Sequence, residues 1–136
     1  LSAWSKVAKM NVAERVQCAY KGGKTERAIL IRDRNRLVSS AVVKSPRITE
    51  SEIESFAAMR NLEDEVLRLI GRRREHTSKY PIVHNLVKNP KTPATIALNL
   101  TGRLTSKDLK SLSGNKDVSE IIRRHAKKLL QTREKH

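Results

Sequence analysis

The sequence has few aromatic residues, few glycines, one cysteine and no long hydrophobic run, and each shortage excludes a class of protein. Phe, Trp and Tyr make up 3% of the 136 residues, and there are 5 glycines, whereas β-sandwiches and barrels use many aromatic and β-branched residues. A single cysteine, Cys18, excludes a disulfide framework and a cysteine-only metal site. No apolar run approaches the ~18 residues of a membrane span, and no signal peptide is recognisable. We therefore expect a soluble, cytoplasmic protein.

Positive charge is what the sequence has in excess. Lys and Arg total 29 against 14 Asp and Glu, which gives a formal net charge of +15. Apolar residues run through every basic stretch, so we expect the cations to lie on a folded surface rather than in a disordered tail. A chain of this length can form one compact domain with a modest core. The excess charge favours a polyanionic partner.

Capping patterns divide the chain into short helices. Asn11, Thr49, Asn61, Thr105 and Asp117 each stand three residues before an acid, which is the spacing of a helix N-cap and an acid that complements the helix dipole. We predict further starts near residues 25, 33–35, 78 and 92. Between the starts, apolar residues recur at helical spacing. These stripes are Val38-Ala41-Val42, Ile53-Phe56-Ala57, Val66-Leu67-Ile70, Ile82-Leu86-Val87, Ile96-Ala97-Leu100, Leu109-Leu112 and Ile122-Ala126-Leu129. The predicted fold class is all-α, with about 8–10 short helices and no sheet.

The chain also repeats itself. Residues 42–47 match residues 86–91 at an offset of 44 positions, and the apolar residues of 62–70 match those of 104–112 at an offset of 42. Periods of this size are typical of solenoids, in which each unit packs only on its neighbours. Half of this period, about 22 residues, fits one two-helix unit. The sequence therefore predicts a short right-handed α-solenoid of two-helix units in one domain, residues 1–131. Residues 1–24 would form N-terminal capping helices, 25–131 the repeats and 132–136 a frayed tail.

The stretches VKNPKTPATIALNL (Val87–Leu100) and VKSPRITESEIESF (Val43–Phe56) resemble leucine-rich repeat variant units and HEAT-like α-solenoid repeats. The chain is also similar to uncharacterised bacterial proteins with such repeats. One type of leucine-rich variant protein carries an iron–sulfur cluster on an added cysteine-rich segment, which this sequence lacks. The resemblance implies a helical fold and a binding role, but no chemistry.

Groups of cations follow the predicted helices. We expect them to align along one edge as a continuous ridge that contacts the phosphates of DNA or structured RNA. The predicted nucleic-acid-binding residues are Arg32, Arg34, Arg36, Lys44, Arg47, Arg72, Arg73, Arg74, Lys88, Lys91, Arg123, Arg124, Lys127 and Lys128. Two alternatives remain. Cations near helix C-termini also complement the helix dipole, and the ridge could instead bind an acidic protein.

Catalytic and cofactor sites are not predicted. Cys18 lies among apolar residues and is expected in the core, and the four histidines lack the spacing of metal ligands. Trp4 is expected to pack against the fold, whereas Tyr80 could be an exposed surface for base stacking. Gly22-Gly23-Lys24-Thr25 is similar to the end of a phosphate-binding loop, but the loop's first glycine position holds Cys18. We therefore expect no enzyme, no cofactor and no metal.

Overall fold

The computed structural model describes residues 2–135. This part of the chain contains helices and no strand, so the predicted all-α class is confirmed. The helices are α1 (Ala3–Ala8), α2 (Val12–Lys21), α3 (Lys24–Leu30), α4 (Arg36–Lys44), α5 (Glu50–Ala57), α6 (Asp64–Arg72), α7 (Arg74–Thr77), α8 (Tyr80–Lys88), α9 (Ala94–Thr101), α10 (Ser106–Ser113) and α11 (Glu120–Glu134). The single turn α7 was not predicted, because its four residues carry no apolar period, and it brings the number of described helices to 11.

Several predicted helix starts agree with the structure. Asn11 and Thr49 form complete capping boxes, in which the side chain accepts from the third backbone N–H and the following glutamate accepts from the cap. Asn35 and Thr105 also cap α4 and α10 through their side chains. Four-residue caps of this kind can be recognised in sequence because they depend only on near neighbours in the chain.

Other starts are displaced because the expected cap is bound elsewhere. The Thr92 hydroxyl donates to the carbonyl of Leu86 at 2.6 Å, so α9 is capped at Pro93 instead. Asp117 pairs with Arg60 at 3.1 Å, and α11 begins at Glu120. The helix predicted at residue 25 begins at Lys24 and the one predicted after Asn61 begins at Asp64.

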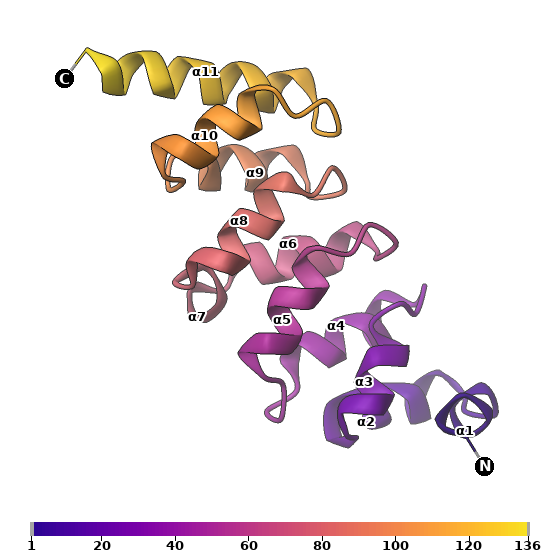
Figure 1. Ribbon diagram of the computed structural model, residues 1–136. Coiled ribbons are helices and arrows are strands. Elements are labelled where there is room, and N and C mark those ends of the chain that lie inside the picture. The colour runs from indigo at the N-terminus through magenta and orange to yellow at the C-terminus, as the bar shows by residue number, and fades with distance from the viewer. Residues whose placement is uncertain (1, 136) are drawn as a thin grey trace.

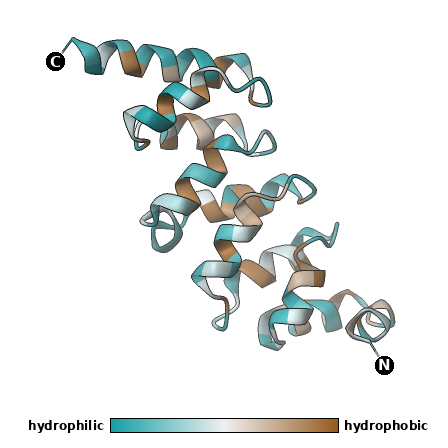
Figure 2. Ribbon diagram, viewed as in Figure 1, coloured by the Kyte–Doolittle hydropathy of each residue, from teal (hydrophilic) through white to brown (hydrophobic). Residues whose placement is uncertain are grey.

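The helices form two layers along an elongated molecule (Figure 1). In the first layer, α2, α4, α6, α9 and α11 follow one another, each in contact with the next. In the second layer, which faces the viewer, lie α3, α5, α8 and α10, with α1 against α3. Hydrophobic residues gather on the helix faces that meet the other layer (Figure 2). Every residue of the predicted apolar stripes is buried, apart from the partly buried Leu129.

The layers give a repeat length that differs from the predicted one. Successive helices of the first layer begin 24, 28, 30 and 26 residues apart. The sequence match at 44 residues joins α4 to α8, which belong to opposite layers. A shift of 44 residues therefore exchanges the layers instead of superposing one repeat on the next. The handedness of the array and its membership of a repeat family remain predictions.

The C-terminal segment differs from the expected frayed tail. Helix α11 continues to Glu134, beyond the boundary at residue 131. The Arg133 guanidinium donates to the carbonyls of Leu104 at 2.8 Å and Gly102 at 2.9 Å. This contact joins the end of α11 to the end of α9, which lies 30 residues earlier in the chain and could not be recognised as a partner from local sequence.

Candidate nucleic-acid interface

The two layers run in opposite directions, and this decides where each cation lies. At one edge of the molecule, α2, α4, α6, α9 and α11 end while α3, α5, α8 and α10 begin (left side of Figure 1). Side-chain contacts bridge neighbouring helix ends there: the Ser45 hydroxyl donates to the carbonyl of Tyr20 at 2.7 Å. At the opposite edge the helix directions are reversed.

The predicted cations are divided between the two edges, so the single continuous ridge is wrong. Lys44, Arg47, Arg72, Arg73 and Arg74 lie at the first edge, where α4 and α6 end. The groups Arg32-Arg34-Arg36 and Lys88-Lys91 lie at the opposite edge, where α3 and α8 end. Arg123, Arg124, Lys127 and Lys128 lie along α11 itself. The division follows from the repeat length, because a 44-residue match places equivalent cations at opposite edges.

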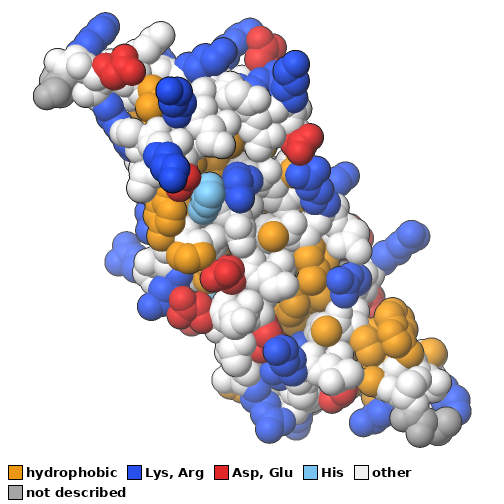
Figure 3. Space-filling view, viewed as in Figure 1, with side chains coloured by type: hydrophobic (Ala, Val, Ile, Leu, Met, Phe, Trp, Pro, Cys, Tyr) orange, Lys and Arg blue, Asp and Glu red, His pale blue; other side chains and the backbone are white. Residues whose placement is uncertain are grey.

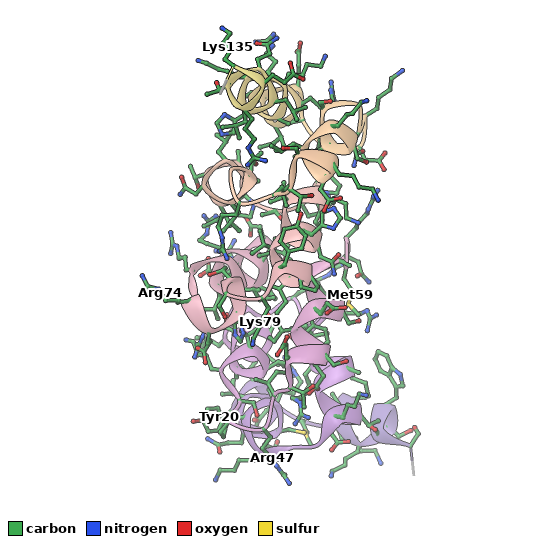
Figure 4. The ribbon with its side chains drawn as sticks, turned by 60° about the vertical axis from the view of Figure 1, so that its left-hand side comes forward. Tyr20, Arg47, Met59, Arg74, Lys79 and Lys135 are labelled. Carbon is green, nitrogen blue, oxygen red and sulfur yellow. The ribbon has the colours of Figure 1, made fainter. Side chains whose placement is uncertain are left out.

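The first edge contains further cations that the sequence reasoning missed. We define the basic edge as its exposed Lys and Arg residues, which come from helix ends and loops along the whole array. They are Lys21, Lys24, Lys44, Arg47, Arg72, Arg74, Lys79, Arg103, Lys107, Arg133 and Lys135. Figure 4 labels four of them, which follow one another from the lower to the upper end of the molecule as Arg47, Lys79, Arg74 and Lys135. Lys21, Lys44 and Arg72 are the last residues of three successive helices of one layer, a signal that becomes visible once the layers are known.

Several acidic residues at this edge have partners nearby, including the exposed Glu50, which lies 3.8 Å from Lys79 of the basic edge. Glu26 accepts from the Gly23 N–H at 3.0 Å, and Glu75 pairs with Arg73 at 2.8 Å. Asp108 accepts from the Tyr80 hydroxyl at 2.5 Å. The hydrogen bond and charge of Arg73 hold the pKa of Glu75 below its ordinary value, and the hydrogen bond from Tyr80 does the same for Asp108. Glu75 and Asp108 therefore stay ionised at neutral pH, and each is held by a neighbouring side chain of the protein.

Several predicted cations have structural partners. Arg47 donates to the carbonyl of Lys21 at 2.9 Å, and Arg32 donates to that of Ala28 at 2.8 Å. Arg124 pairs with Glu120 at 3.0 Å, and Arg123 donates to the carbonyl of Val118. Other predicted cations are exposed and have no ion-pair partner within residues 2–135. These are Arg34, Arg36, Lys44, Arg72, Arg74, Lys88, Lys91, Lys127 and Lys128.

The opposite edge has a polar cleft of about 310 Å³, lined by Ala58, Arg60, Asn85, Lys88, Asn89 and Asn115. Its polar groups already have structural partners. Asn89 donates to the carbonyls of Ala57 and Met59, Asn85 donates to that of Glu54, and Arg60 pairs with Asp117. The cleft therefore joins the ends of α5, α8 and α10 and presents Lys88 as its unpaired cation.

The structure places two aromatic residues for which the sequence left a role open or predicted packing. The Tyr80 hydroxyl is bound to Asp108 and also accepts from the Thr105 N–H at 3.0 Å, while its ring lies 5.9 Å from that of His84. The tyrosine thus links α8 to α10 and is only partly exposed, so it is a poor stacking surface. Trp4 was expected to pack, but its side chain is 65% exposed on α1.

Other kinds of site to consider among the described residues are a metal site, a reactive cysteine and a membrane-spanning helix. Among residues 2–135 no group of three or more His, Cys, Asp and Glu residues could hold a metal ion. Cys18 packs partly against the core, and burial raises the pKa of its thiol. No described helix is long and apolar enough to cross a membrane.

On the face formed by the second layer, Lys and Arg side chains are scattered over the surface and both its sides, with fewer Asp and Glu among them (Figure 3). No family model, curated protein or solved structure matches this chain.

Proposed function

We propose that the protein is a non-catalytic, cytoplasmic nucleic-acid-binding protein that contacts the phosphate backbone of DNA or structured RNA through the basic edge. The observation that carries this proposal is the recurrence of exposed cations at the same end of successive helices, with several of the neighbouring carboxylates held by other groups of the protein. Each contact between a cation and a phosphate releases condensed counterions, which is the main source of sequence-independent affinity.

The dimensions of the basic edge suit a duplex. Neighbouring packed helices are about 8–10 Å apart, so the four steps from α2 to α11 extend over roughly 32–40 Å. One turn of B-form DNA is about 34–36 Å long. Cations spaced along this edge could therefore follow the phosphates of about one turn. The scarcity of exposed aromatic residues argues against single-strand binding by base stacking.

Fluorescence anisotropy with labelled 20-base-pair DNA, 20-base-pair RNA and single strands, measured over a salt series, tests the proposal. The edge variant Lys21→Ala/Arg72→Ala/Lys107→Ala removes three cations from the basic edge. The control variant Arg34→Ala/Lys91→Ala/Lys116→Ala removes one Arg and two Lys from the opposite edge. All six side chains are exposed, so we expect both variants to fold.

We expect the duplexes to bind and the logarithm of affinity to fall linearly with that of salt concentration. If its three cations contact phosphates, the edge variant should lower that slope by about 3, since each phosphate contact contributes about 0.9. The control should change the slope little. An equal reduction of the slope in both variants would mean that net charge alone attracts the duplex. An absence of binding at low salt would leave an acidic protein as the partner.

A further inference from the structure

A second surface lies on the outside of the first layer. A groove of about 580 Å³ runs between α2 and α4 and is lined mainly by Val16, Tyr20, Leu37, Ala41 and their neighbours. Leu37 is 70% exposed and Tyr20 is 43% exposed. Single exposed apolar residues are common on protein surfaces, but a contiguous apolar groove indicates a binding site.

The groove is built from two parallel apolar stripes. Val16 and Tyr20 stand four residues apart on α2, and Leu37 and Ala41 stand four residues apart on α4. The two helices run side by side in the same direction, because the Ser45 hydroxyl after α4 binds the carbonyl of Tyr20 near the end of α2. On the α4 side the lining extends from Arg36 to Lys44, a distance of about 12 Å along a helix. The groove is thus long enough for about two turns of a third helix.

The charged residues on the rim of the groove indicate the charge that its partner should carry. Arg36 and Lys44 lie at the two ends of the α4 side, and both are exposed without an ion-pair partner within residues 2–135. Glu65 is the acid that lines the groove, and Arg68 holds its carboxylate at 3.4 Å. An apolar floor between two unpaired cations complements an apolar helix face flanked by carboxylates.

We propose that the α2–α4 groove binds an amphipathic helix of an acidic protein, with apolar side chains at i, i+4 spacing between Glu or Asp residues. The site is separate from the phosphate-binding residues, except that Lys44 lies where the groove meets the basic edge. Tyr20, at that end of the groove, is labelled in Figure 4. Helix binding in this groove does not require nucleic acid at the basic edge.

Two fluorescein-labelled 16-residue peptides test the proposal. The first carries Leu at positions i, i+4 and i+8 with Glu at both ends, and the second has Lys in place of each Glu. We expect saturable binding of the acidic peptide with a Kd of about 10–100 μM, a range typical of a small and isolated contact. The Leu37→Ser variant should weaken it at least about fivefold, because it removes an exposed apolar anchor.

Charge reversal separates a specific site from general attraction. The Arg36→Glu/Lys44→Glu variant should exchange the preference between the two peptides, whereas the Arg34→Glu/Lys91→Glu control should keep it. Binding that does not saturate below about 1 mM, or that is indifferent to Leu37→Ser, overturns the proposal. Duplex binding measured on Leu37→Ser should be unchanged, so a failure of this site is distinguishable from a failure of the nucleic-acid proposal.

Discussion

Ser45 and Asn89 form equivalent hydrogen bonds in opposite layers. Each follows the last residue of a helix and donates its side-chain hydrogen to a backbone carbonyl at the end of the preceding helix of its layer: Ser45 to Tyr20 at 2.7 Å, and Asn89 to Ala57 at 2.9 Å. Each also accepts from the backbone N–H two residues later. These bonds hold successive helix ends in register, and they explain why the same short motif occurs after α4 and after α8.

Replacing Asn89 should loosen the contact between α5 and α8. Asn89 is buried and donates to two carbonyls, so Asn89→Ala leaves Ala57 and Met59 without this partner. We expect a loss of about 1–3 kcal/mol in the free energy of unfolding, measured by urea denaturation. Asn85→Ala is the matched control, because its bond to Glu54 is exposed and water can replace it. An equal loss in both variants would contradict this assignment.

Gly71 is required where α6 crosses α9. A Cβ at this position would lie 2.3 Å from the Cγ2 of Ile96, a buried side chain with little freedom to move. Gly71→Ala should therefore destabilise the fold by about 1–3 kcal/mol, as overpacking generally does. At Gly102 a Cβ would meet nothing within 4 Å and the backbone is already in the right-handed helical region. Gly102→Ala should be neutral or stabilise by up to about 1 kcal/mol. Thermal unfolding of the two variants tests the difference, and a stable Gly71→Ala protein would refute it.

Arg27 and Glu52 form a buried ion pair between α3 and α5. Two hydrogen bonds join them, at 2.7 and 3.2 Å, and both side chains are almost completely buried. Glu52→Ala should cost about 3–5 kcal/mol, because it leaves Arg27 charged and buried. The double variant Arg27→Met/Glu52→Leu should lose much less, because no unpaired charge remains. A larger loss in the double variant would show that the pair itself is the main stabilising element.

The stabilisation that the Arg27–Glu52 ion pair contributes depends on pH. Burial raises the pKa of Glu52, but the bonds from Arg27 and Thr49 outweigh it, and the pKa is lowered from its ordinary value of 4.5. The folded state therefore binds this proton less readily than the unfolded state. The stabilisation is complete above about pH 4.5 and is lost as pH falls through the lower pKa of the folded state. Urea denaturation of wild type and Glu52→Gln between pH 7 and pH 3 tests this. The difference between their free energies of unfolding should become smaller toward pH 3.

His76 should make the fold sensitive to mild acid. It is buried, and its Nε2 has no hydrogen-bond partner. Burial lowers its pKa below the ordinary 6.5, with Glu75 opposing and Arg73 assisting this shift. Protonation therefore favours the unfolded chain once the pH falls below about 6.5. Wild type should lose more unfolding free energy than His76→Gln between pH 7.5 and pH 5.5. Equal losses in the two proteins would exclude His76 as a source of this sensitivity.

The sequence by itself determined the local features of this protein. The capping boxes at Asn11 and Thr49 and the buried stripes of α4 and α6 could be predicted, because caps depend on near neighbours and helix burial follows a fixed period. The net charge of +15 likewise follows from composition alone.

Only the tertiary structure decided which cations share a surface. Lys44 and Lys88 occupy equivalent places in the repeated motif but lie at opposite edges, because α4 and α8 belong to layers that run in opposite directions. The local sequence predicts a frayed tail around Arg133, yet this residue holds the end of α9 through carbonyls about 30 residues away in the chain. Both outcomes depend on which helices pack together, and that pairing is set by long-range contacts that local periodicity does not encode.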